Sequence, residues 1–184
     1  MAPPVDPLVH GFMYDRHGQP RGLLMSIRVC FVCLGNICRS PTADGVMVQL
    51  VHHAELSDQI IVDSAGTSAH HVGEGADRRS AAVALERGYA LTSRSRQFVP
   101  SDWKRFDYVL AMDRSNLRNL QRLPGARGFT GTLALFRDFD PTAARGSDTP
   151  DPYYGGSGGF DDVLDICERG CQGLLDHIRA EHGL

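Results

Sequence analysis

The sequence lacks the features that mark membrane-bound, secreted or strongly charged proteins. None of its apolar stretches approaches the ~20 residues that a membrane-spanning helix needs. The formal net charge is only −3, which gives no reason to expect nucleic acid or an anionic membrane as a partner. The N-terminus has no basic patch leading into an apolar segment, so we expect no secretory signal. These absences favour a cytoplasmic protein.

Cysteine is scarce and forms no recognisable framework. The chain has five cysteines, an odd number, and three of them, Cys30, Cys33 and Cys38, lie within nine residues. Cys30 and Cys33 have the spacing of a redox or zinc pair, but no second pair and no histidines stand at metal-ligand spacing. The sequence therefore predicts neither a disulfide framework nor a metal site, and we expect no cofactor.

The length of 184 residues fits one domain, large enough to bury about 70% of its unfolded surface. Residues 1–25 contain prolines and histidines and show little hydrophobic periodicity. We interpret them as an N-terminal extension that is flexible or loosely packed on the surface, and a translated leader remains an equal alternative. Residues 26–184 then form the domain.

Apolar runs alternate with helical patterns along this domain. The predicted strands are Ile27–Val32, Ile60–Val62, Tyr108–Met112 and Thr132–Phe136. The predicted helices begin near Ser40, span Ala76–Arg87 and Arg114–Gln121, include a short one capped by Ser101 or Asp102, and end with a long one from Phe160. This alternation predicts an α/β fold with three α/β/α layers and a four-stranded, parallel, doubly wound sheet, which binds ligands beyond the carboxyl ends of its strands.

The segment that follows the first predicted strand reads Cys-Leu-Gly-Asn-Ile-Cys-Arg-Ser-Pro, from Cys33 to Pro41. Gly35 and Asn36 tolerate backbone torsions that other residues avoid, so we expect a tight loop. Its N–H groups, together with the positive end of the following helix, would bind an anion. The planar fork of Arg39 suits two phosphate oxygens, and the same positive field favours the thiolate of Cys33, which is the nucleophilic form. The segment predicts nucleophilic attack on phosphorus.

Two further residues of this segment have expected roles. Ser40 should cap the helix, with Pro41 in its first turn, and the Ser40 hydroxyl could also hydrogen-bond the Cys33 thiolate. Cys38 is close enough in sequence to form a reversible disulfide with Cys33, which would protect the nucleophile from over-oxidation. A small buried residue is an equally good interpretation of Cys38.

With these residues the chain resembles the low-molecular-weight protein tyrosine phosphatases, whose signature is matched from Cys33 to Ser40. The resemblance runs from about Ile27 to the C-terminus. It recurs at Asp63–Gly66, Phe106–Tyr108, Met112–Leu117 and Asp151–Tyr154. It implies a protein-tyrosine phosphatase that hydrolyses phosphotyrosine through a phosphocysteine intermediate on Cys33. Its expected partners are phosphotyrosine-containing proteins or peptides, with phosphate and other oxyanions as inhibitors.

The resemblance also assigns roles to individual residues. It implies that Arg39 binds the transferring phosphate and that Asp151 protonates the leaving tyrosine oxygen, although Asp151 alone would indicate only a turn. Tyr153 and Tyr154 are expected to form an apolar wall for the substrate ring. The other expected substrate-binding residues are Leu34, Gly35, Asn36, Ile37, Cys38 and Ser40.

Five positions bear on how the loop is supported and which substrate it selects. In the family the residues that match Asn36 and Ser64 hold the loop together with a histidine, whose place is taken here by Ser93. The departure at Ser93 leaves the support of the loop open. His70 and His71 fall where the variable loop of the family contacts substrate.

Three other functions were weighed against this one. Arsenate reductases of the same fold use two further cysteines in the middle of the chain, and none occurs here between Cys38 and Cys167. A phosphotyrosine-binding module without activity would be expected to lack the nucleophile or the acid. Phosphatases that prefer phosphoarginine carry threonine at the position of Ile37, so the apolar side chain favours phosphotyrosine.

Overall fold

The computed structural model describes residues 26–154 and 158–184, so the proposed N-terminal extension lies outside the described residues and stays a prediction. The strands are β1 (Ile27–Cys33), β2 (Ile60–Gly66), β3 (Tyr108–Ala111) and β4 (Thr132–Leu135). The helices are α1 (Arg39–His53), α2 (Arg78–Glu86), α3 (Arg114–Arg122) and α4 (Gly159–His182). The short helical turns are η1 (Pro100–Lys104), η2 (Ala126–Gly128), η3 (Phe136–Phe139) and η4 (Pro152–Tyr154).

The four strands form one parallel sheet in the order β2-β1-β3-β4. This confirms the predicted α/β class and the doubly wound topology. From β1 the chain winds first toward β2 and then back past β1 to β3 and β4. The loop after β1 therefore lies where the direction of winding changes, which is the usual ligand site of such sheets.

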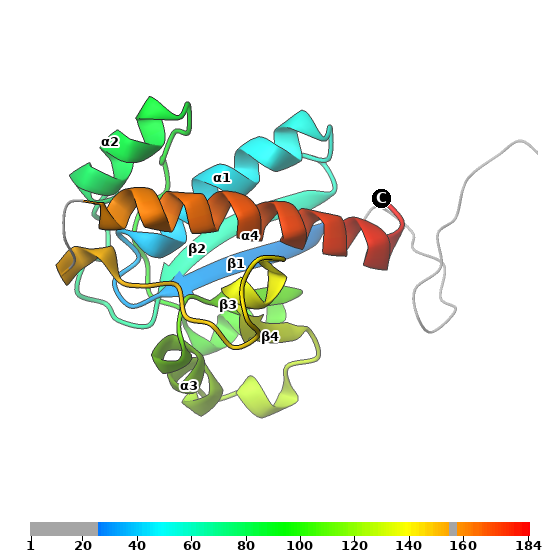
Figure 1. Cartoon of the computed structure of the whole chain (residues 1–184). Coiled ribbons are helices and arrows are strands. Elements are labelled where there is room, and N and C mark those ends of the chain that lie inside the picture. The colour runs from blue at the N-terminus through cyan, green and yellow to red at the C-terminus, as the bar shows by residue number, and fades with distance from the viewer. Residues whose placement is uncertain (1–25, 155–157) are drawn as a thin grey trace, which may run out of the picture.

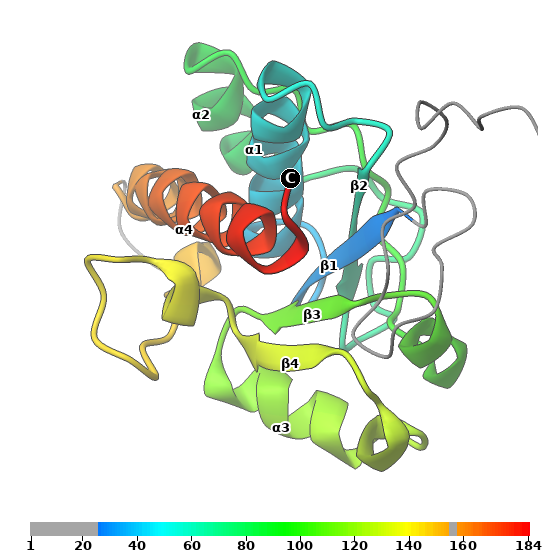
Figure 2. The ribbon, with the colours of Figure 1, turned by 90° about the vertical axis from the view of Figure 1, so that its right-hand side faces the viewer.

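Helices cover both faces of the sheet. Figures 1 and 2 show α1, α2 and α4 on one face and α3 with η1 on the other. Successive β1 side chains enter two separate cores, since side chains alternate along a strand. Val29 and Phe31 pack with α1 and α4, whereas Cys30 and Val32 pack with the aromatic cluster around Trp103.

Two predicted helix starts were wrong. The residue that precedes α1 is Cys38, which provides no side-chain cap, and Ser40 is the second residue of the helix, with its hydroxyl turned toward Cys33. The helical turn η1 follows Val99, with Pro100 in its first position, rather than Ser101 or Asp102. The Asp102 carboxylate instead reaches back to accept the Val99 N–H at 2.9 Å, which is half of a capping box.

The remaining boundaries moved by a few residues. β2 runs on to Gly66, beyond the predicted Val62, because each of its residues pairs with one of β1, up to Gly66 opposite Cys33. The long final helix is confirmed as α4, with Cys167 and Cys171 fully buried on its apolar face. Within the part of the chain that the structure describes, no helix combines the length and apolar character needed to span a bilayer.

Candidate active site

The loop between β1 and α1 is shaped by one left-handed residue and two close approaches. Asn36 has φ +55°, whereas Gly35 does not have a positive φ, so the left-handed torsion falls only on Asn36. Gly35 is needed for space instead, because a Cβ there would lie 3.0 Å from the His71 ring. A Cβ on Gly66 would lie 2.7 Å from the Leu34 carbonyl oxygen, so the loop packs directly on the end of β2.

The Cys33 sulfur lies among hydrogen-bond donors. The Asn36 N–H donates to Sγ at 3.2 Å, and the Ser40 hydroxyl lies 3.0 Å from Sγ. The Asn36 side-chain amide donates to Ser40 Oγ at 2.9 Å, and the Ser40 hydroxyl has two acceptors for its own proton, Sγ at 3.0 Å and the Ala65 carbonyl at 3.4 Å. The predicted contact between Ser40 and Cys33 is therefore present.

Arg39 is 3% exposed and its guanidinium is bound by oxygen atoms on two sides. Nη1 donates to Asp113 Oδ2 at 2.6 Å and to the Thr149 carbonyl at 3.2 Å, and Nη2 donates to Asp151 Oδ2 at 2.8 Å. Burial acts to lower the pKa of Arg39, but the charges of Cys33, Asp151 and Asp113 outweigh it and hold the pKa above its ordinary value. The group is therefore a permanent cation beside the sulfur.

These residues surround a small cavity of about 150 Å³ at the carboxyl ends of β1 and β2. It is lined by Cys33, Leu34, Gly35, Ile37, Cys38, Arg39, His71, Asp151 and Tyr153. Leu34 and Tyr153 are about half exposed, so they form an apolar rim. The size suits a phosphate group at the bottom with a larger group emerging past the rim.

The segment that carries Asp151 is anchored to the end of β3. The Thr149 N–H donates to the Met112 carbonyl at 2.7 Å. The Arg114 guanidinium, at the start of α3, binds both Asp148 carboxylate oxygens and lowers the pKa of that group. Asp151 itself also accepts the Tyr153 N–H at 3.1 Å. The carboxylate is therefore held beside the cavity by contacts on both sides of it.

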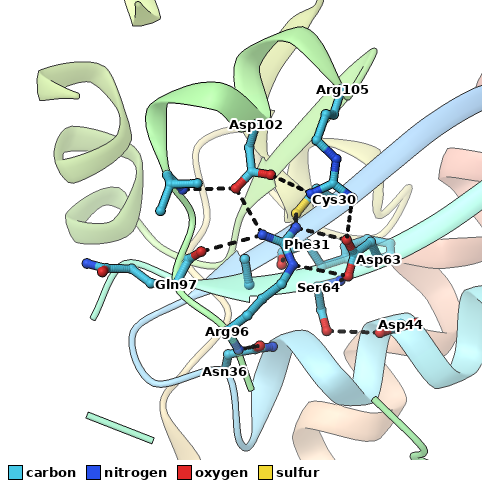
Figure 3. A network of polar contacts seen from close by, with 12 residues as sticks. Cys30, Phe31, Asn36, Asp44, Asp63, Ser64, Arg96, Gln97, Asp102 and Arg105 are labelled. Atoms are coloured by element: carbon cyan, nitrogen blue, oxygen red, sulfur yellow. Dashed lines mark hydrogen bonds and ion pairs between the residues drawn. The ribbon is translucent and has the colours of Figure 1, made fainter. Parts of the chain in front are cut away.

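The loop is supported from behind by the segment around Arg96 (Figure 3). The Arg96 N–H donates to the Asn36 side-chain oxygen at 2.9 Å, and the Ser95 hydroxyl donates to the Gly35 carbonyl at 3.0 Å. The Arg96 guanidinium is fixed by Asp63 at 2.8 Å and by Asp102 at 2.9 Å. These contacts bring residues about 60 positions apart in sequence to the back of the loop.

The family pattern implies that Ser64 hydrogen-bonds the loop, but the Ser64 side chain does not hydrogen-bond the loop directly. Its hydroxyl donates to Asp44 of α1 at 2.9 Å (Figure 3), and Ser93 lies close enough to the same carboxylate to act on its pKa. Burial raises the pKa of Asp44, and the two hydroxyls oppose that shift. Ser93, which replaces the family histidine, thus acts on a carboxylate of the helix that follows the loop.

The predicted residues meet at one site, but not all of them line it. Asn36 and Ser40 lie buried next to the sulfur, behind the cavity lining. Ser64 lies behind the loop, whereas Asp113 reaches the site through Arg39. The Tyr154 side chain lies outside the described residues, so its predicted role stays a prediction.

Other residues of the site were missed or left open. Ser95, Arg96 and the Thr149 carbonyl carry no local pattern that would have indicated them. Burial raises the pKa of the Cys38 thiol to about 12, and both Cys38 and Cys33 are free cysteines. Within residues 26–154 and 158–184, no three His, Cys, Asp or Glu side chains gather in a way that could hold a metal ion.

Comparison with known proteins identifies the architecture. The sequence model of the family described as low molecular weight phosphotyrosine protein phosphatase matches residues 28–183. The chain belongs to this family. Members of this family are protein-tyrosine phosphatases, and the match covers the loop after β1 as well as the segment that carries Asp151.

Individual members of this phosphatase family agree with that assignment. A low molecular weight protein-tyrosine-phosphatase of Streptomyces coelicolor is 46% identical over 158 residues, which cover 85% of this chain and 96% of that protein. A protein tyrosine phosphatase structure from Entamoeba histolytica, with Hepes in its active site, is 43% identical with a TM-score of 0.78 and covers 86% of this chain and 99% of that one. A Drosophila arginine phosphatase structure is 30% identical with a TM-score of 0.73, covering 83% and 98%.

Proposed function

We propose that this phosphatase hydrolyses phosphotyrosine through a phosphocysteine intermediate on Cys33, with Asp151 as general acid. The observation that carries the proposal is the arrangement of Cys33, Arg39 and Asp151 around one cavity of phosphate size. Sγ lies at the end of the loop with two hydrogen-bond donors beside it, while the carboxylate lies next to the guanidinium that would bind the phosphate.

In the first step, the Cys33 thiolate attacks phosphorus and the bond from phosphorus to the phenolic oxygen breaks. Arg39 binds two of the equatorial oxygens and stabilises the charge spread over them in the transition state. Asp151 gives its proton to the phenolic oxygen, so that a neutral tyrosine leaves. Tyr153 provides the wall along which the departing ring lies.

In the second step, water attacks the phosphocysteine and the bond from phosphorus to sulfur breaks. Asp151, now ionised, takes a proton from the water, and inorganic phosphate is released. The electron pair returns to Cys33 as a thiolate. The N–H of Asn36 donates to sulfur and lowers the energy of that leaving group, and the Ser40 hydroxyl, 3.0 Å from sulfur, adds to this when it turns its proton to the thiolate.

A phosphate dianion and Asp151 compete for the same guanidinium. Arg39 Nη2 is bound to Asp151 at 2.8 Å, and bidentate phosphate binding needs that nitrogen. Substrate binding therefore replaces the carboxylate and frees it to face the leaving oxygen. Phosphate, vanadate and other oxyanions should inhibit by occupying the same place.

Phosphoarginine is the second candidate substrate, because one related structure is an arginine phosphatase. Ile37 lines the cavity in this chain and offers no polar partner to a guanidinium. Desolvating that guanidinium without a hydrogen bond would cost about 1–3 kcal/mol, enough for roughly ten- to hundredfold discrimination. We therefore propose phosphotyrosine as the preferred substrate.

The test compares peptides that carry phosphotyrosine, phosphoserine or phosphoarginine at one position. We expect the highest kcat/KM for phosphotyrosine and the lowest for phosphoserine, whose short side chain cannot reach the bottom of the cavity. The Ile37→Thr variant should move the preference toward phosphoarginine. Hydrolysis of phosphoarginine by the wild type at least as efficiently as phosphotyrosine would overturn the substrate assignment.

The setting that we propose is the cytoplasm, with phosphotyrosine-containing proteins as partners. All five cysteines are free thiols in the structure, which suits a reducing compartment better than an oxidising one. A reactive thiolate at Cys33 also needs a reducing environment to stay active. Cell fractionation with antibodies to the protein would test this location.

A further inference from the structure

Arg79 of α2 contacts the aromatic side of the site from outside the cavity. Its guanidinium lies over the Tyr153 ring, 5.1 Å from the ring centre, and over the Phe160 ring at 4.6 Å. Tyr153 lines the cavity, and Phe160 is the second residue of α4. Arg79 thus contacts the chain on both sides of residues 155–157, which connect the segment that carries Asp151 to α4.

Arg79 is held in a fixed orientation by its neighbour Asp77. The Asp77 carboxylate accepts from Arg79 Nε at 3.0 Å, from Nη2 at 2.8 Å and from the Arg79 backbone N–H at 2.8 Å. The hydrogen bonds from Arg79 lower the pKa of Asp77, so the partner stays ionised. Two parallel contacts to a planar guanidinium fix its plane as well as its position, which a single contact would not do.

Arg79 and Asp77 are also connected to the loop between β1 and α1 and to Asp151. The Asp77 backbone N–H donates to the Ile37 carbonyl at 2.7 Å, so the start of α2 is fixed to the loop. On the other side, the Tyr153 N–H donates to Asp151 Oδ1 at 3.1 Å. A displacement of Tyr153 would therefore reach the carboxylate through its own backbone.

Resting on the phosphatase function proposed above, we propose that Arg79 is a positioning residue that selects aromatic phosphoesters. Arg79 holds the Tyr153 ring as a wall beside the cavity. Asp77, which binds both Arg79 and the loop after β1, fixes the position of that wall relative to the loop. A wall that is already ordered loses less side-chain freedom when a substrate ring packs against it. A cation over an exposed ring is a modest contact, so removal should weaken aromatic ligands by about 2- to 5-fold.

The first test measures binding without turnover. Calorimetry compares benzylphosphonate, which carries a ring, with methylphosphonate, which fills only the phosphate position. The variants are Arg79→Ala, Arg79→Lys and, as the matched control, Arg78→Ala, which removes the neighbouring exposed arginine. We expect Arg79→Ala to lose about 2- to 5-fold in benzylphosphonate affinity with methylphosphonate unchanged, and Arg79→Lys to lie between it and the wild type. The control should match the wild type.

The second test uses turnover of two aryl phosphates. Because Asp151 is linked to Tyr153, Arg79→Ala should slow phenyl phosphate, which needs the acid, more than p-nitrophenyl phosphate, whose leaving group needs little protonation. A merely structural role would lower thermal stability and slow both substrates equally, and this outcome would overturn the proposal. So would equal losses for both phosphonates, or an Arg79→Ala variant that behaves like Arg78→Ala.

Failure of the proposed phosphatase function would give different results from failure of the role of Arg79. A wild type that bound neither phosphonate and released no phosphate from phosphotyrosine peptides would remove both that function and the role of Arg79. If the wild type is active but all four proteins show the same preference for benzylphosphonate over methylphosphonate, only the role of Arg79 is removed.

Discussion

Two arginines of this chain each lie between two aspartates and near a cysteine of β1, and one of them, Arg39, lines the cavity of the candidate active site. Arg39 binds Asp113 and Asp151 beside Cys33. On the other face of the sheet, Arg96 binds the Asp63 and Asp102 carboxylates, and its Nη2 lies 3.8 Å from the Cys30 sulfur (Figure 3).

The two arrangements differ in what surrounds the sulfur. Cys30 is fully buried inside β1, and burial raises the pKa of its thiol well above the ordinary value. Cys33 ends the strand, so the loop can supply the Asn36 N–H and the Ser40 hydroxyl to its sulfur. The same residue types therefore form a candidate nucleophilic site around Cys33 and a structural ion-pair cluster around Arg96. We call this second cluster, Arg96 with Asp63, Asp102 and Cys30, the brace. Position at the end of the strand makes the difference.

The largest expected effect separates the two cysteines. Cys33→Ser should lower kcat by at least about 10⁴-fold, because an alcohol is a poor nucleophile in this setting, while phosphate should still bind. Cys30→Ser makes the same chemical change in the brace and should keep most of the turnover. The measurement is kcat for phenyl phosphate, with phosphate inhibition as the binding control. Similar losses in both variants would contradict the distinction between the sites.

The next effect concerns the aspartate that is expected to leave its arginine. Asp151→Asn should slow phenyl phosphate by roughly 10²–10⁴-fold and p-nitrophenyl phosphate by much less, since only the poor leaving group needs the proton. Inorganic phosphate should inhibit the variant more tightly than the wild type, because Arg39 no longer has a competing carboxylate. Equal slowing of both substrates would exclude Asp151 as the donor.

The corresponding change in the brace should act on stability instead. Asp102 is fully buried and binds Arg96, Arg105 and the Val99 N–H. Asp102→Asn keeps an acceptor but leaves the two guanidinium groups without their shared anion, and should lower the free energy of unfolding by about 2 kcal/mol. Urea unfolding measures this. If kcat/KM for phenyl phosphate fell as far as it does in Asp151→Asn, the brace would have to be counted as part of the active site.

The contrast between these arrangements also shows what the sequence could predict. Strand, loop and helix around Cys33 follow from short-range pattern, since Cys33 and Arg39 are six positions apart and the loop chemistry is local. The role of Ser40 as a cap was wrong because the helix begins one residue before Ser40, at Arg39, which places Ser40 inside the first turn with its hydroxyl beside the Cys33 sulfur. The brace could not be predicted, because Arg96 meets Asp63 and Asn36 only after β2 has paired with β1.

A smaller effect concerns Asp44, which lies between the two arrangements. Burial raises the pKa of Asp44 in the folded protein, so above about pH 4 the unfolded chain releases this proton more readily than the folded one. Ionisation therefore costs stability as pH rises from about 4 toward the raised value. Asp44→Asn removes that cost and keeps an acceptor for Ser64. Denaturant unfolding of both proteins from pH 4 to 7 should show the variant gaining on the wild type as pH rises; parallel curves would contradict the assignment.

The smallest effect tests the connection between brace and loop. The Ser95 hydroxyl donates to the Gly35 carbonyl at 3.0 Å, next to the Arg96 N–H that binds Asn36. Holding that carbonyl away from the cavity keeps the loop in the shape that binds an anion, so Ser95→Ala should weaken phosphate inhibition by about 2- to 10-fold, the value of one hydrogen bond. Ser101→Ala, an exposed serine of η1, is the control and should change nothing. Ser95→Thr keeps the hydroxyl and should restore most of the affinity, whereas a loss that threonine cannot restore would show that packing, and not this hydrogen bond, supports the loop.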